Sequence, residues 1–232
     1  MRGCEMSMIS EQETANELDA LDEGSAKRRQ ILEGAREVFM AEGFDGASMN
    51  DVARVAGVSK GTLYVYFSSK EQLFETLIRE RKRQQAERML SSRFESADMR
   101  VALTEFGCEL IAMMARPEHM ATLRMVIAAA GKFPQIGRAF FEAGPCFGVR
   151  LLSAYLRRMA DEGRLSIEDF DRAAWQFLDL CKSETLMPLL FRVVDEVPPE
   201  RIRATIEAAV DMFLAIYAPG RPHACAPTPA SL

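Results

Sequence analysis

The stretch SMNDVARVAGVSKGTLYVYFSSKEQLF, residues 48–74, decides the fold of this chain. It contains two short helical segments, after Ser48 and after Ser59, joined by AGVSK, which is the spacing of a helix-turn-helix. Ala53 is small enough to let the two helices approach closely, and Gly57 can adopt the left-handed backbone that a sharp turn needs. Ser59 can cap the second helix, whose positive end then faces outward toward phosphates or base edges. The pattern therefore predicts a DNA-binding domain in the N-terminal part of the chain, called the head below.

A helix is expected on each side of this motif. On the N-terminal side, apolar residues recur at helical spacing between Ser25, a plausible N-cap, and Gly43, a plausible stop. These apolar residues are Ile31, Leu32, Ala35, Val38 and Phe39. On the C-terminal side, Ser69 can cap a helix that runs to about Leu90, roughly 30 Å long and therefore able to link two domains.

The remaining chain keeps the helical period, interrupted only by Gly and Pro residues. Helices are expected at roughly 98–115, 118–130, 134–143, 145–162, 168–191 and 199–217. No strand-like alternation is evident, so the chain is predicted to be all-α with about ten helices. The expected domains are a disordered acidic tail at 1–24, a helix-turn-helix domain at 25–84, a C-terminal domain at 85–218 and a second disordered tail at 219–232.

The charge distribution agrees with a DNA-binding head. The net charge of −5 taken whole argues against a generally basic nucleic-acid-binding protein. Residues 1–24, however, carry one basic and seven acidic residues (−6), whereas residues 25–83 carry eleven basic and eight acidic residues (+3). The remainder carries 17 basic and 19 acidic residues (−2). The head is thus mildly basic, which predicts a small number of phosphate contacts per protomer.

The motif resembles the helix-turn-helix signature of the TetR family of transcriptional regulators, from Ile31 through Leu77, including TLYVYF and the SKEQLF that follows. RMVIAAAGKFPQIGRAFFEAGP and WQFLDLCKSE are similar to the AcrR- and AefR-type branch. The resemblance implies an N-terminal three-helix bundle with the helix-turn-helix, joined to an α-helical ligand-binding and dimerisation domain. It also implies a homodimer on a palindromic double-stranded DNA operator, with recognition helices about 34–36 Å apart.

The resemblance assigns DNA contacts to the second short helix and to the starts of its neighbours. Thr62 is expected at a base edge, Lys60 at guanine or phosphate, and Gly61 at close backbone approach. Tyr64 and Tyr66 are expected to donate to phosphate oxygens, although both could be ordinary core aromatics of an unrelated helix. Ser48, at the start of the first short helix, and Lys70, at the start of the long one, are expected to bind phosphates. The full set is Ser48, Lys60, Gly61, Thr62, Tyr64, Tyr66 and Lys70. Leu63 and Phe67 have core spacing instead.

The C-terminal part is rich in Met and Phe, which build a deformable apolar interior. The resemblance places an effector pocket there, and the expected lining is Met113, Met125, Phe140, Phe147 and Trp175. No cluster of charged residues indicates an ionic ligand, so a small apolar or aromatic effector is expected. Cys146 could alternatively be a redox sensor, but a lone Cys after a proline is more often inert.

The last two helices are expected to form the dimer interface. Its predicted residues are Phe177, Cys181, Ile206, Val210, Phe213, Leu214 and Tyr217. The opposite side of the last helix carries small or flexible residues, namely Ala204, Ala208, Met212 and Ala215. The penultimate helix is apolar on more than one side, as packing on its own subunit and on a partner requires.

Several classes of protein are disfavoured. The sequence has no HExxH, GxSxG, Walker A or GxGxxG motif and only two histidines, so no catalytic residue, metal or cofactor is expected and the chain is not expected to be an enzyme. Five cysteines without a CxxC pair indicate reduced thiols in a cytoplasmic protein, and no apolar run is long enough for a membrane helix. The predicted function is a ligand-responsive repressor of an efflux or catabolic operon; a DNA-binding protein without an effector, acting in chromosome organisation or activation, is the alternative.

Overall fold

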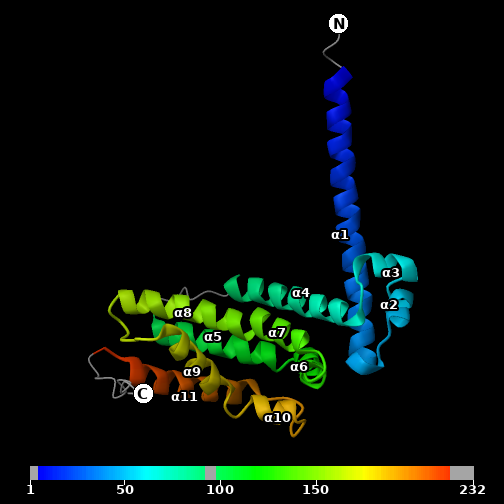
Figure 1. Ribbon diagram of the computed structural model, residues 1–232. Helices are drawn as coiled ribbons and strands as arrows, with labels where there is room; N and C mark the ends of the chain where they lie inside the picture. The colour runs from blue at the N-terminus through cyan, green and yellow to red at the C-terminus, as the bar shows by residue number, and fades with distance from the viewer. Residues whose placement is uncertain (1–4, 92–97, 220–232) are drawn as a thin grey trace, which may run out of the picture. The chain divides into compact units, whose positions relative to one another are not determined.

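The computed structural model describes residues 5–91 and 98–219, which form helices joined by turns and short loops (Figure 1). The helices are α1 (Glu5–Gly46), α2 (Met49–Val55), α3 (Lys60–Tyr66), α4 (Lys70–Ser91), α5 (Met99–Met114), α6 (Pro117–Ala130), α7 (Pro134–Ala143), α8 (Pro145–Asp161), α9 (Phe170–Lys182), α10 (Leu186–Leu190) and α11 (Pro199–Tyr217). No strand occurs within these ranges, which confirms the all-α prediction. None of the described helices is long and apolar enough to cross a bilayer.

The chain divides into two compact units, and the division differs from the predicted boundary. Of the residues described, those up to 78 together with 129–136 form the head, and those at 79–128 and from 137 onward form the second unit. The boundary thus lies inside α4 rather than at residue 84. The turn between α6 and α7 belongs to the head, which the sequence did not indicate.

An aromatic cluster holds the head together. The Phe39 and Phe74 ring centroids are 4.7 Å apart, and the Phe44 and Phe74 centroids are 5.1 Å apart. Phe133, from the α6–α7 turn, meets Phe44 edge-on at 5.4 Å. Such edge-to-face and tilted pairs are each favourable by about 0.5–1.5 kcal/mol beyond the area they bury. These contacts explain why residues 129–136 belong to the head.

Helices α1 and α2 approach each other more closely than side chains normally allow. A Cβ atom placed on Gly34 would lie 2.7 Å from both the Cβ and the backbone N of Ala56. Gln30 Nε2 also donates to the Ala56 carbonyl at 2.6 Å. Glycine at position 34 therefore sets the distance between α1 and the helix-turn-helix.

The turn of the helix-turn-helix has the expected geometry. Gly57 has a φ of 64°, in the left-handed region, and the Val58 N–H donates to the Ala53 carbonyl at 3.0 Å. The Ser48 and Ser59 hydroxyls cap α2 and α3, accepting from the Asp51 and Thr62 backbone N–H groups. The predicted roles of Gly57 and Ser59 are confirmed.

In the second unit, α5, α8, α9 and α11 surround one apolar core. α8 packs along α9, and α11 packs against both α5 and α9. Gly107 in α5 lets α11 come close, because a Cβ there would lie 2.7 Å from Ile206 Cγ2. The largest fully buried side chains in this unit include Leu103, Leu152, Leu156, Phe177, Ile206 and Phe213.

One helix prediction needs correction, and the disordered tail expected at residues 1–24 stays a prediction. The backbone is helical from Glu5 as part of α1, and this helix is broken at Gly43 (φ 71°), the predicted stop. The predicted helix at 168–191 is two helices, because Pro188 cannot donate an N–H and its ring crowds the carbonyl of Glu184. The predicted C-terminal tail lies outside the described residues from 220 onward.

Candidate DNA-binding surface and effector cavity

Helix α3 presents an accessible face next to a buried one. Lys60, Gly61 and Tyr64 are exposed, whereas Thr62 and Tyr66 are half-buried. Leu63 and Phe67 are buried in the head core, as their spacing indicated. Lys60 Nζ lies 6.0 Å from the centroid of the Tyr64 ring, so a cation and a phenol stand together on the accessible face.

The start of α3 is held in a defined orientation. Ser59 Oγ accepts from the Thr62 N–H at 3.0 Å, and the two hydroxyl groups lie 2.8 Å apart. Because a hydroxyl has one donor and two acceptor positions, the Thr62 hydroxyl can still reach a base edge while bonded to Ser59. The cap thus fixes the rotamer of a predicted base-reading residue.

Val65 is an accessible residue of α3 that the sequence analysis did not select. Its side chain is 82% exposed, which is unusual for a branched apolar residue in a head that buries Leu63 and Phe67 completely or nearly so. An apolar side chain on a recognition helix can contact a thymine methyl group. Its position between the two tyrosines of TLYVYF is the sequence feature that could have indicated this exposure.

Two predicted phosphate contacts have other roles in this structure. Lys70 Nζ donates to the carbonyls of Phe44 (2.7 Å) and Ala47 (3.0 Å), with the Asp45 carbonyl at 3.4 Å. It also lies 4.7 Å from the Phe44 ring centroid. A lysine has three N–H donors, so these carbonyls occupy its ammonium inside the head.

Ser48 is engaged in a similar way. Its hydroxyl donates to the Asp51 carboxylate and accepts from the Asp51 N–H. This hydroxyl bond, followed by the Arg54 guanidinium, holds the pKa of Asp51 below its usual value. Both side chains therefore stabilise helix ends of the head, and their contacts with phosphate stay predictions.

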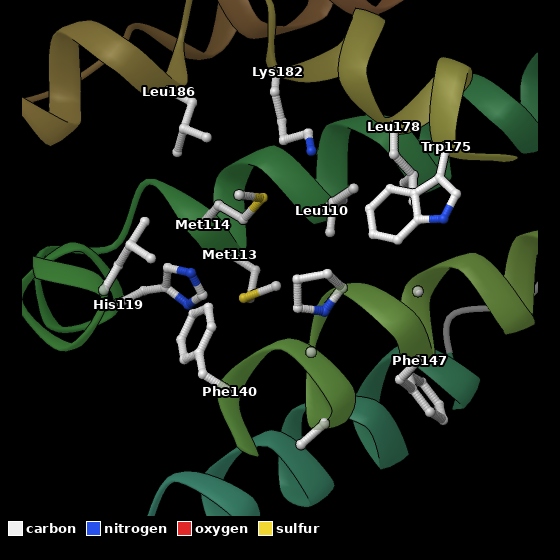
Figure 2. Close-up of a pocket in the computed structure, with 15 residues that line it drawn as sticks. Leu110, Met113, Met114, His119, Phe140, Phe147, Trp175, Leu178, Lys182 and Leu186 are labelled. Carbon is white, nitrogen blue, oxygen red and sulfur yellow. The ribbon is translucent and has the colours of Figure 1, made fainter. Parts of the chain in front are cut away.

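The second unit contains an apolar cavity of about 190 Å³ between α5, α6, α7, α8, α9 and α10 (Figure 2). Its lining consists of Leu110, Met113, Met114, His119, Leu123, Phe140, Ala143, Gly144, Pro145, Phe147, Gly148, Trp175, Leu178, Lys182 and Leu186. Four of the five predicted residues line it: Met113, Phe140, Phe147 and Trp175. Met125 does not.

Some of the cavity residues that were not predicted are helical neighbours of predicted ones. Leu110 and Met114 lie three residues before and one residue after Met113 on α5, and Leu178 lies one turn after Trp175 on α9. The polar residues His119 and Lys182 were not predicted to line the cavity, because a segment rich in Met and Phe indicates an apolar lining.

The predicted dimer residues lie mostly inside the protomer. Phe177, Cys181, Ile206, Val210 and Phe213 each expose 1% or less of their surface. Side chains without accessible surface cannot contact a partner, so the prediction that these five form the interface is wrong. Their stripe on α9 and α11 is the core of the unit instead.

Leu214 and Tyr217 are half-buried at the edge of that core. Tyr217 Oη donates to Gln176 Oε1 at 2.6 Å, and its ring packs 4.7 Å from the Phe213 ring. The outward face of α11 carries an uncharged stripe that comprises Ala204, Ala208, Met212, Ala215 and Ile216. This stripe, and not the predicted one, is accessible to a partner.

The described residues offer no metal centre and no group of three or more potential metal ligands. Cys108, Cys146 and Cys181 are free thiols. Burial, followed by the neighbouring Cys108, raises the pKa of Cys181 to about 12, which keeps it protonated and unreactive.

Two family models and several known proteins match this chain. The family described as "Bacterial regulatory proteins, tetR family" matches residues 31–77, and the "AefR-like transcriptional repressor, C-terminal domain" matches residues 101–219. The HTH-type transcriptional repressor Rv1474c of Mycobacterium tuberculosis is 27% identical over 80% of this chain and 92% of its own length. The repressor AcnR of Corynebacterium diphtheriae is 43% identical, but the match spans only 24% of this chain and 30% of that protein.

Solved structures agree over most of the chain. A TetR-family regulator from Mesorhizobium loti has a TM-score of 0.78 at 27% identity, covering 84% of this chain and 98% of its own. The flavonoid-responsive regulator FrrA has a TM-score of 0.75 at 31% identity, covering 85% of this chain and 100% of its own. A helix-turn-helix head followed by an AefR-like helical domain thus places this chain in the TetR family of transcriptional repressors.

Proposed function

We propose that this chain is a homodimeric repressor that holds a palindromic operator and releases it when a small aromatic effector enters the cavity of the second unit. The observation that carries the proposal is the cavity itself, which is lined by three aromatic side chains and two methionines next to aliphatic ones. Planar aromatic molecules suit such a lining, since flexible thioethers adapt to their shape.

One relative supports an aromatic effector. FrrA, which is similar over its whole length, is named a flavonoid-responsive regulator. Flavonoids are phenolic aromatics that cells export or degrade, so an efflux or catabolic operon is the target that fits the proposal. Operators are part of the chromosome, and the proposal therefore includes a cytoplasmic location.

The chain offers a route from the cavity to the head. His119 and Leu123 of α6 and Phe140 and Ala143 of α7 line the cavity. The turn that joins these two helices belongs to the head, where Phe133 meets Phe44. An effector that prefers one spacing of α6 and α7 would therefore shift the head between two states, and only its differential affinity for those states can weaken DNA binding.

The dimer is proposed to form through the outward face of α11, not through its buried stripe. Arg203, Glu207 and Asp211 flank the uncharged stripe on the same helix. Arg203 pairs with Glu207 at 3.6 Å, and Arg100 pairs with Asp211. A small-residue centre with a charged border is the arrangement of a protein interface with an apolar core and a polar rim.

The proposal is tested by fluorescence anisotropy, which measures binding of the protein to a labelled DNA fragment from the region upstream of its own gene. A flavonoid aglycone should weaken DNA binding by about 5–150-fold, the range of typical allosteric coupling. Ala143→Leu would fill part of the cavity and should remove the response while DNA binding persists. Ala112→Leu, an exposed position on α5 outside the lining, is the matched control and should respond like the wild type. An operator affinity that stays constant at saturating ligand would refute the switch.

A further inference from the structure

The ionisable side chains of the cavity are of one chemical kind. Of its fifteen lining residues, two are ionisable, His119 and Lys182, and both are bases. No aspartate or glutamate belongs to this lining. Trp175 contributes one further polar group, an indole N–H. The lining thus carries two basic side chains and no carboxylate.

Lys182 places a positive charge at the edge of a mostly apolar cavity. It is the last residue of α9, and its side chain is 23% exposed. Nζ lies 2.7 Å from Oδ1 of Asp179, one helical turn earlier, whose side chain is 69% exposed. Since the Asp179 carboxylate is largely solvated, water weakens this pair and leaves the ammonium donors for a ligand.

The three polar groups surround the apolar interior rather than cluster at one point. Figure 2 shows His119 and Trp175 on opposite sides of the cavity, with Lys182 extending from α9 toward the space between them. His119 is 8% exposed, and its ring centroid lies 6.1 Å from that of Phe140. A ligand that fills the interior would therefore lie against apolar side chains such as Met113 and Phe140 and could reach Lys182 at one edge.

We propose that the effector is an aromatic molecule that carries an acidic oxygen, a carboxylate or a phenolate, bound against Lys182 Nζ, and that aromatic cations are excluded. The proposal rests on the proposed function, and it adds a charge requirement that an apolar lining alone does not imply. A hydrogen bond between ions is stronger than a neutral one, and in a mostly apolar cavity it is screened less than in water. An aromatic cation would meet Lys182 with no acidic lining residue to offset the repulsion.

Three probes with one skeleton test the charge requirement: a naphthalene carboxylate, its methyl ester and the corresponding naphthylmethylammonium. Binding to the full-length protein is measured by calorimetry and by thermal shift. The carboxylate should bind about 10-fold or more tightly than the ester, and the ammonium should not bind measurably. Lys182→Met, which keeps most of the side-chain volume, should reduce the affinity for the carboxylate to that for the ester.

Asp179→Asn is the matched control variant. It removes the partner of Lys182 and keeps the lysine charge, so the carboxylate should bind at least as tightly as to the wild type. If the ester or the ammonium binds as well as the carboxylate, or Lys182→Met leaves their ranking unchanged, the charge requirement is refuted. If unsubstituted flavone, a flavonoid skeleton without an acidic group, binds at least as tightly as the carboxylate, the charge requirement again fails and the proposed function stands. If neither the flavonoid nor any probe binds, both proposals fail.

Discussion

Adjacent residues on α11 provide a decisive test of the dimer interface. Phe213 is 1% exposed, and its ring lies 5.2 Å from Phe177 and 4.7 Å from Tyr217. Met212, the preceding residue, is 50% exposed on a different side of the helix. Replacing each in turn with glutamate places the same charge one residue apart, once in the core and once on the surface.

The two substitutions should differ by several kcal/mol in the free energy of unfolding. Phe213→Glu loses the ring contacts, which costs about 3–5 kcal/mol, and the buried carboxylate adds several more. Because a domain is stable by only about 5–15 kcal/mol, this variant should not fold. Met212→Glu changes a surface position and should shift the stability of the protomer by less than about 0.5 kcal/mol.

The assay combines circular dichroism with light scattering. Met212→Glu should keep its helical signal and halve its mass, since two like charges would face each other across a twofold axis. Phe213→Glu should lose its cooperative melting transition. A Met212→Glu protein that remains a dimer at micromolar concentration would show that the outward face of α11 is not the interface. A well-folded, monomeric Phe213→Glu would instead show that the stripe with Ile206 and Phe213 forms the interface.

Three further substitutions test the head. Gly34→Ala should destabilise the protein by about 1–3 kcal/mol in urea denaturation, because its Cβ would lie 2.7 Å from Ala56. Gly131→Ala, with nothing within 4 Å of its Cβ, is the control and should be close to neutral. Equal unfolding midpoints for the two variants would refute the close approach at Gly34. Thr62→Ala should relax base preference at one operator position at a cost of about 1–3 kcal/mol in a competition assay, and an unchanged preference at every position would mean that it does not read a base. Lys70→Met should lower thermal stability while the salt dependence of operator binding stays the same; a slope smaller by about one unit would instead identify a phosphate contact.

The head was predictable because its determinants are local. Gly57 and Ser59 act within a few residues of themselves, and the turn and cap that they form can be read from spacing alone. Gly34 is different, because its role depends on Ala56, twenty-two positions away, and becomes visible only when α1 and α2 are placed together. Phe133 is still more remote from Phe44, so no local pattern could assign the α6–α7 turn to the head.

The cavity and the interface show a second limit of periodicity. On α11 both faces are uncharged over several turns, and the sequence pattern alone does not say which faces inward. The structure buries the bulkier stripe, with Ile206 and Phe213, and leaves Ala208 and Met212 outside. Larger side chains remove more apolar area from water, which is the physical reason for that choice. Lys182 was not predicted to line the cavity, because a charged side chain at the end of a helix is normally exposed to solvent.

These two limits bear on the same mechanism. The side chains proposed to select an effector lie on α6, α7 and α9, and the side chains predicted to read DNA lie on α3, so neither set determines the other. What the two have in common is the chain between His119 and Phe140, which lines the cavity at both ends and supplies Phe133 to the head in between. A change of effector class through Lys182 should therefore alter which molecules release the operator and leave the operator sequence unchanged. Conversely, a substitution at Thr62 should alter the operator and leave the order of effector affinities unchanged, because coupling transmits free energy between the sites without transmitting their chemistry.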